Sequence, residues 1–357
     1  MFSIVIGTII GLLLIMLFIL WLWGPGKVES YLDENGNVLE GSVSEIARVE
    51  IGGLEQGMII KGKKDTNPVL LFLHGGPGNP EYVLAKEYNI NLEDYFTVCW
   101  WEQRGSGMSY SSSIEKGSIT LDQMIFDTVE VTNYLRERFG KEKIYIMGHS
   151  WGSFLGINSI DRYPELYEAY LGIGQVVNQF ESEKLGYELM LSTAEANGDE
   201  KSIKNLKKFT LNTPEDITTD YLMVRSSIMN EQGYGVFHMP KSKCGLLMPI
   251  FKAKEYTIKD KYGYAAGSLL SLEQPMNHSI NITNLNETIK ELKVPVYIFH
   301  GIYDKQVSYD IALKYYEGLK APKKQFYKFE NSAHSPFMEE VDKFMGIIKE
   351  DILQVYS

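Results

Sequence analysis

The pentapeptide Gly-His-Ser-Trp-Gly at residues 148–152 sets the interpretation of the whole sequence. It follows the apolar run at 143–147, which predicts a buried strand, and it precedes residues 153–157, which predict the start of a helix. A serine on so sharp a turn needs neighbours without side chains two positions away, because a Cβ atom there would clash across the turn. The two glycines meet this need. Ser150 is therefore a candidate nucleophile, with an ordinary glycine-rich turn as the alternative.

Strand and helix patterns alternate on both sides of this turn. Continuous apolar runs at residues 68–73 and 95–101 predict strands that are buried on both faces. Residues 121–139 have helical spacing, a late strand is expected at 294–299, and an amphipathic helix at 336–355 is expected to close the chain. This alternation predicts an α/β fold with a mostly parallel sheet and helices on both faces.

The alternation stops at about residue 175 and resumes at about residue 291. Between these points the sequence is polar, has helical spacing and shows no long buried strand. We therefore predict an α/β core made of residues 46–174 and 291–357, interrupted by a helical cap at residues 175–290. Ligands bind at the carboxyl ends of the strands in open α/β sheets, so we expect the cap to act as a lid.

The N-terminal segment has a different character. Residues 1–23 carry no charged side chain and would form a helix of about 33–35 Å, enough to cross a hydrocarbon core of about 30 Å. A cleaved signal peptide would need a basic start and a small-residue cleavage site, and neither is visible. We therefore predict a single-pass N-terminal transmembrane anchor and a polar linker at residues 24–45. Lys27 is the only basic residue nearby, so the side of the membrane stays undetermined.

Composition restricts the classes of function. The chain has 357 residues, a formal net charge of −11 and no basic run, so we expect no nucleic-acid partner. Cys99 and Cys244 are too few for a disulfide framework, and the six histidines lack the spacing of metal ligands. The sequence therefore implies neither a metal nor a cofactor, and it leaves the oligomeric state open.

Ser150 can act as a nucleophile only with a base that accepts its proton and a carboxylate that orients the base. On a sheet of this kind, the acid and then the histidine follow the serine along the chain. Asp304 lies in the loop after the strand at 294–299, and His334 lies in the loop after a strand at 325–329. Each could be an ordinary loop residue, but both positions agree with the order that Ser150 sets. We therefore predict a triad of Ser150, His334 and Asp304.

Two other histidines lie close to these residues in the sequence. His300 comes before Asp304, which is the wrong order for the base. His149 adjoins Ser150, but we expect its side chain to point away from the partner of Ser150 and to serve packing. Neither histidine is therefore assigned a catalytic role.

The tetrahedral intermediate of acyl transfer carries an oxyanion, which needs fixed N–H donors. One donor is expected from Trp151, the residue after the nucleophile. The other is expected from the loop His74–Gly78, with the sequence HGGPG, because it follows the strand at 68–73 and its glycines allow a close approach. A loop without any donor role is the alternative.

These motifs carry a family resemblance. HGGPG at 74–78, WEQRGSG at 101–107 and GHSWG at 148–152, with Asp304 and His334, resemble the α/β-hydrolase fold, and more narrowly its prolyl aminopeptidase (proline iminopeptidase) group. The resemblance covers about residues 45–355. It implies a catalytic triad of Ser150, Asp304 and His334. It also implies an oxyanion hole formed by the N–H groups of Gly76 and Trp151. The group's Asp-Gln-Arg-Gly element begins with Glu102 here, and we expect that loop to provide structural support.

The resemblance also bears on the substrate. Proline-specific relatives bind the free α-amino group of the substrate with glutamates of the cap, near a cap tryptophan. Here the tryptophans lie at 21, 23, 100, 101 and 151, so the predicted cap has none. Among the cap acids Glu181, Glu183, Glu188 and Glu231, we take Glu231 as the substrate-binding candidate. Solvated helix charges are the alternative for each of them.

The sequence thus predicts a membrane-anchored serine hydrolase that needs no cofactor. An aminopeptidase of the proline iminopeptidase type, acting on short peptides with an N-terminal proline or a similar small residue, is the first choice. A carboxylesterase, amidase or lipid-acyl hydrolase is the alternative among enzymes, and a non-catalytic binding protein on the same fold is the alternative outside them. Epoxide hydrolases and dehalogenases are disfavoured because their nucleophile is an aspartate where this chain has Ser150.

Overall fold

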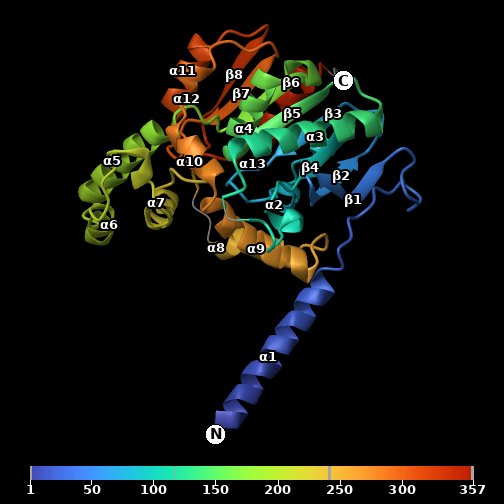
Figure 1. Cartoon of the computed structure of the whole chain (residues 1–357), viewed down its shortest axis with the longest axis horizontal. Coiled ribbons are helices and arrows are strands. Elements are labelled where there is room, and N and C mark those ends of the chain that lie inside the picture. Colours follow the sequence, from blue (N-terminus) through green and yellow to red (C-terminus); the bar gives the residue numbers. More distant parts are fainter. Residues whose placement is uncertain (1, 116, 240–242, 355–357) are drawn as a thin grey trace.

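The computed structural model describes residues 2–115, 117–239 and 243–354. Its centre is an eight-stranded sheet in the order β1-β2-β4-β3-β5-β6-β7-β8, with helices packed against it (Figure 1). β2 pairs antiparallel with β1 and β4, and the remaining neighbours are parallel. The strands are β1 (Val43–Ile51), β2 (Leu54–Gly62), β3 (Val69–Leu73), β4 (Thr97–Trp101), β5 (Ile144–His149), β6 (Tyr167–Ile173), β7 (Val296–Gly301) and β8 (Lys324–Phe329).

The side chains of β3 show that helices cover both faces of the sheet. Leu71 and Leu73 belong to one apolar cluster, which includes side chains of α3, α4 and α12. Leu70 and Phe72 belong to a second cluster, which includes side chains of α2, α13 and α14. The predicted α/β architecture with a mostly parallel sheet is therefore confirmed. The core helices are α2 (Tyr82–Glu87), α3 (Leu121–Phe139), α4 (Trp151–Arg162), α12 (Tyr309–Gly318), α13 (Pro336–Glu339) and α14 (Val341–Ile347).

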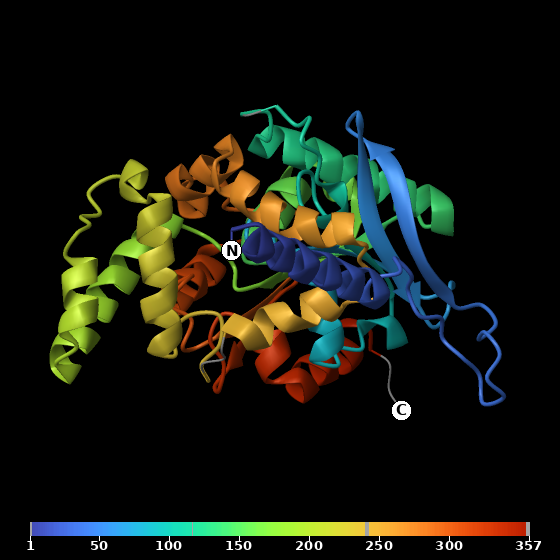
Figure 2. The ribbon, with the colours of Figure 1, turned by 90° about the horizontal axis from the view of Figure 1, so that it is seen from below.

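The chain between β6 and β7 is helical where the structure describes it. An antiparallel bridge between Asn178 and Asn284 joins the two ends of this segment close to the sheet. Seen from below, α5–α7 stand to one side of the sheet, while α8 and α9 lie beside α1 (Figure 2). The helices are α5 (Gln179–Asn197), α6 (Glu200–Leu206), α7 (Thr219–Glu231), α8 (Lys243–Lys252), α9 (Ile258–Leu272), α10 (Pro275–Ile282) and α11 (Leu285–Thr288).

The N-terminal helix α1 (Phe2–Trp23) forms where the sequence predicts a helix, and it projects away from the α/β core (Figure 1). Its carboxyl end meets α8 and α9, where Gly24 is buried against the backbone of Tyr256. Among the described residues, however, no helix combines the length and the hydropathy that a membrane span requires. The predicted transmembrane segment is therefore not supported.

The end of the chain differs from the single helix predicted at 336–355. α13 and α14 are separated by Glu340, which leaves helical geometry with φ −124° and ψ 58°. The side chain of Glu340 accepts hydrogen bonds from the backbone N–H of Asn331 (2.9 Å) and the hydroxyl of Ser332 (2.6 Å). The break therefore places a carboxylate against the loop that leads to His334.

Candidate active site

Ser150 lies on the predicted sharp turn between β5 and α4. Its backbone has φ 55° and ψ −119°, a conformation that costs a residue with a side chain about 1–3 kcal/mol. A hydrogen bond from its N–H to the carbonyl of Ile173 (2.9 Å) helps to hold it there. A Cβ atom on Gly152 would lie 1.9 Å from the carbonyl oxygen of Leu73, and one on Gly148 would lie 2.1 Å from that of Gly152. Larger residues would therefore open the turn that presents the serine.

Asp304 and His334 meet behind the pocket. Asp304 follows β7 and His334 follows β8, and His334 Nδ1 lies 2.7 Å from Asp304 Oδ2. The other carboxylate oxygen, Oδ1, accepts hydrogen bonds from the backbone N–H groups of Gln306 (3.0 Å) and Val307 (2.9 Å). These two bonds fix the carboxylate plane, so Oδ2 faces the imidazole. The proton of His334 is thereby held on Nδ1, which leaves Nε2 as an acceptor.

The electrostatics of this pair suit a base. Burial alone would raise the pKa of Asp304, but His334 and His300 outweigh it and hold this pKa well below its usual range. Burial, together with the nearby charges of His149 and His300, lowers the pKa of His334 although the Asp304 carboxylate raises it, so the imidazole stays neutral to lower pH than usual. His334 Nε2 is buried, and it has no hydrogen-bond partner among the described residues. An unpaired acceptor thus lines the same pocket as Ser150, with which it makes no direct hydrogen bond.

The two expected oxyanion donors come from different elements. Trp151 is the first residue of α4, so its N–H has no carbonyl one turn earlier in the helix to bind. Gly76 lines the same pocket as Ser150, and its φ of +116° lies in a region that side chains rarely adopt. The start of a helix and this glycine loop both favour negative charge on a bound substrate.

The loop between β4 and α3 ties these parts together. Trp151 Nε1 donates to Gln103 Oε1 (2.9 Å), and Gln103 Nε2 donates to the carbonyl of His74 (3.0 Å). Glu102 accepts hydrogen bonds from Met108 N–H and the Tyr256 hydroxyl, both at 2.5 Å, while burial raises the pKa of Glu102 to about 7. None of these side chains lines the pocket, so the loop supports the site from behind.

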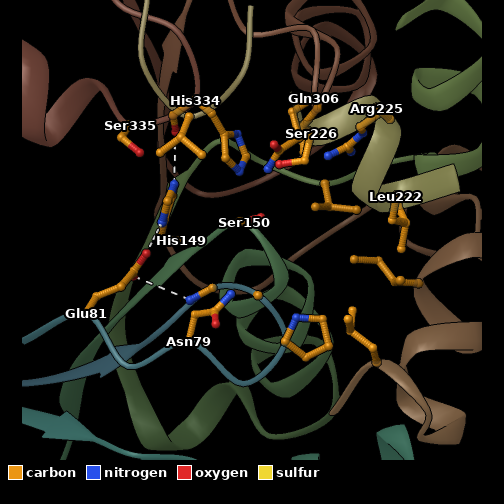
Figure 3. Close-up of a pocket in the computed structure, with 18 of the residues that line it drawn as sticks. Asn79, Glu81, His149, Ser150, Leu222, Arg225, Ser226, Gln306, His334 and Ser335 are labelled. Atoms are coloured by element: carbon orange, nitrogen blue, oxygen red, sulfur yellow. Dashed lines mark hydrogen bonds and ion pairs between the residues drawn. The ribbon is translucent and has the colours of Figure 1, made fainter. Parts of the chain in front are cut away.

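The pocket itself has a volume of about 550 Å³ and is mostly apolar. Ser150 and His334 lie at one side of it, while Leu222 and Arg225 of α7 face them from the other (Figure 3). Its apolar walls come from the core and from the helices between β6 and β7, and include Val176, Ile217, Leu222, Phe237, Leu246, Ile250, Ile280 and Met338. In the described ranges, no three histidine, cysteine, aspartate or glutamate side chains are arranged to hold a metal ion.

The structure does not bring Glu231 to this pocket. Glu231 is the last residue of α7, is exposed and accepts a hydrogen bond from Ser227 (3.1 Å) within the same helix. Glu183 lines the pocket instead, but it is committed to Arg225, whose Nε donates to Glu183 Oε2 at 3.0 Å, and to the Tyr221 hydroxyl, also at 3.0 Å. The sequence did not show which cap acid faces inward.

The expectation for His149 was wrong. Its side chain lines the pocket, with Nδ1 2.5 Å from Glu81 Oε1 and Nε2 2.9 Å from the carbonyl oxygen of His334 (Figure 3). Its ring centroid lies 4.8 Å from that of His334. Glu81 carries little signal in the sequence, where it is only an acid three residues after the HGGPG loop.

Comparison with known proteins identifies the class to which this fold and site belong. Residues 68–186 match the family described as alpha/beta hydrolase fold. The chain is 34% identical over 307 residues to the probable aminopeptidase YbaC of Bacillus subtilis, covering 86% of this chain and 96% of the relative. It is 27% identical over 310 residues to a proline iminopeptidase of Saccharolobus solfataricus, covering 82% and 87%. The structure of a proline iminopeptidase from Mycobacterium smegmatis superposes with a TM-score of 0.60 at 15% identity, covering 87% and 98%.

The chain belongs to the α/β-hydrolase family and is a serine hydrolase. Within that family it is similar to the aminopeptidase and proline iminopeptidase relatives, as the sequence motifs predicted.

Proposed function

We propose that the chain hydrolyses small acyl substrates through an acyl-enzyme formed on Ser150. His334 Nε2 takes the proton of the Ser150 hydroxyl as the hydroxyl oxygen attacks the scissile carbonyl carbon, and Asp304 stabilises the imidazolium that forms. The N–H groups of Gly76 and Trp151 bind the oxyanion. His334 then gives its proton to the leaving amine or alcohol, and water releases the acyl group by the same steps. The observation that carries this proposal is the 2.7 Å contact between His334 and Asp304, which leaves Nε2 unpaired at the pocket that Ser150 lines.

We propose an aminopeptidase of the proline iminopeptidase type, acting on short peptides, as the first choice of activity. The names of the two curated relatives support it. A pocket of about 550 Å³ admits a small acyl group and a short leaving group but not a folded chain. The helices at 175–290 would act as the cap that closes over such a substrate.

One observation favours a second candidate, an esterase for neutral acyl groups. Two glutamates line the pocket, and each already faces a basic side chain: Glu81 faces His149, and Glu183 faces Arg225. Binding an α-ammonium group would therefore require one of these pairs to open. The remaining wall is mostly apolar, which suits an uncharged acyl group.

A paired substrate series separates the two candidates. We expect free-amine prolyl and alanyl arylamides to be hydrolysed, with kcat/KM falling about 10- to 100-fold when the same compounds are N-acetylated, because the ammonium contact is lost. The two compounds of each pair release the same arylamine, so a difference between them does not come from leaving-group reactivity. If the acetylated compounds and simple acyl esters react as well as the free amines, the aminopeptidase assignment is wrong and the esterase assignment stands.

We further propose that α1 attaches the enzyme to lipid. The helix has 22 residues without an acidic or basic side chain in its first or last turn. Its exposed side chains include Ile9 (52%), Leu12 (61%) and Phe18 (58%), and the helix projects from the core (Figure 1). Such exposed apolar surface is costly in water and favourable in lipid.

Removal of residues 1–23 tests this attachment. We expect the full chain to sediment with membranes and the shortened chain to stay in the supernatant with unchanged kcat/KM on a small substrate, because no described residue of α1 lines the pocket. Washing the membranes with alkaline carbonate then distinguishes a helix inserted in the bilayer, which is retained, from one held at the surface, which is released. Equal sedimentation of the two chains would contradict the proposal.

A further inference from the structure

A chain of three buried side chains crosses the site beside the nucleophile. Glu81 precedes α2, His149 is the last residue of β5, and His334 lies in the loop after β8. His149 Nδ1 lies 2.5 Å from Glu81 Oε1, and His149 Nε2 donates to the backbone carbonyl of His334 at 2.9 Å. All three are at least nine-tenths buried. The His149 imidazole thus connects Glu81, 68 positions before it in the sequence, with His334, 185 positions after it.

The second oxygen of the Glu81 carboxylate reaches a different part of the site. Glu81 Oε2 accepts a long hydrogen bond, 3.4 Å, from the backbone N–H of Gly75, next to the expected oxyanion donor Gly76. Three loops therefore meet through this carboxylate and His149: the HGGPG loop, the turn that holds Ser150 and the loop that holds His334 (Figure 3). The mechanism above assigns this pair no role.

The charges of this pair bear on His334. Burial alone would lower the pKa of His149, but the Glu81 carboxylate, with the His334 carbonyl and Asp304, outweighs it, so the pKa of His149 is raised. The His149 ring lies 4.8 Å from the His334 ring, and its positive charge when protonated helps to lower the pKa of His334. The titratable groups that face this pair are His334, Asp304 and Tyr264, and the Glu81 carboxylate helps to raise the pKa of the Tyr264 hydroxyl.

We propose that Glu81 and His149 are positioning residues for the hydrolytic reaction: they hold the carbonyl of His334, and with it the base, in register with Ser150 and the HGGPG loop. This inference rests on the proposed function. A hydrogen bond to the backbone carbonyl of His334 restricts how far the loop that carries the base can shift. A displacement of about 1 Å from the productive geometry lowers the reaction rate strongly. Among the described residues, His149 is the donor that reaches the His334 carbonyl oxygen from the side of β5, and no other side chain there replaces it.

Two substitutions at one position separate the hydrogen bond from the charge. The amide nitrogen of Gln stands at about the place of His Nε2, so His149→Gln keeps the donor and removes the charge, whereas His149→Leu removes both. We expect His149→Leu to lower kcat about tenfold with little change in KM, and His149→Gln to recover most of that loss. In both variants the acid limb of kcat/KM should move to higher pH, because the cation that lowers the pKa of His334 is gone. Glu81→Gln should act in the same direction, and combining it with His149→Leu should add little further loss.

The controls keep the outcomes distinct. His278→Leu changes an exposed histidine of α10 that does not line the pocket, and it should leave kcat and the pH profile unchanged. If His149→Leu matches wild type, or if its loss merely follows a lower Tm and is neither rescued by Gln nor accompanied by a pH shift, the pair is structural and the proposal fails. If Ser150→Ala keeps full activity, the proposed function itself fails, which is a separate result.

Discussion

Replacing Ser150 by alanine should abolish labelling of the protein by a fluorophosphonate probe and reduce kcat by about 10⁴- to 10⁶-fold. The probe reacts only with a serine hydroxyl whose proton can be accepted by a nearby base. His334 Nε2 is an unpaired, buried acceptor at the same pocket. The oxyanion donors and the pocket stay intact in this variant, so substrate binding and residual catalysis should survive. Labelling is measured on gels, and kcat with whichever arylamide or ester the substrate series selects.

Ser159→Ala is the matched control, because Ser159 lies about two and a half turns further along α4. Its buried hydroxyl donates to the carbonyl of Leu155 (2.8 Å) and does not face the pocket. We expect it to be labelled and to turn over substrate like wild type. Undiminished labelling of Ser150→Ala would overturn the assignment of the nucleophile.

The fold could be predicted because its signals are local. The apolar runs at 68–73 and 95–101 correspond to β3 and β4, since a strand buried on both faces must be apolar throughout. The turn at Ser150 also has a local signal, its two glycines. A Cβ on Gly148 would meet the carbonyl oxygen of Gly152 at 2.1 Å, within the turn, whereas one on Gly152 would meet that of Leu73 on β3 at 1.9 Å. The order of Asp304 and His334 then follows from the order of the strands, and the structure places the two side chains in contact.

The contacts that could not be predicted from the sequence are those between side chains on loops that lie far apart in the chain. The contact of Glu81 with His149 is set by how the segment before α2 folds back over the end of β5, and no local pattern encodes it. The cap acids pose a similar problem, because the apolar side chains of α7 are spread around the helix and do not mark a buried face. Glu231 is exposed, although Arg225 of the same helix lies in the pocket.

The break in the C-terminal helix has the same kind of origin. The spacing at 336–355 suits a helix, but Glu339 and Glu340 are hydrogen-bonded to the loop before His334: Glu339 to Ala333 N–H (2.8 Å) and Glu340 to Asn331 N–H (2.9 Å). These tertiary bonds offset the helical hydrogen bonds that are lost at the break. The loop that carries His334 is thus held from two sides, by the carboxylates of Glu339 and Glu340 at the junction of α13 and α14 and by His149.

Replacing Asp304 by asparagine should lower kcat by about 10⁴-fold without unfolding the protein. The N–H groups of Gln306 and Val307 both donate to Asp304 Oδ1, so the amide oxygen of asparagine must take that place. Its NH₂ group then faces His334 Nδ1, which has to accept a hydrogen bond. The imidazole proton is thereby moved to Nε2, where it blocks transfer from Ser150.

A pH profile distinguishes this tautomer effect from general damage to the site. The Asp304 carboxylate raises the pKa of His334, so its loss should lower that pKa, and the acid limb of the remaining activity should move to lower pH. This is the opposite direction to His149→Leu. Asp310→Asn, at an exposed position on α12, should change neither kcat nor the profile. If Asp304→Asn kept more than about a tenth of wild-type kcat at an unchanged Tm, Asp304 would not be the residue that orients the base, because a correctly oriented tautomer is required for proton transfer.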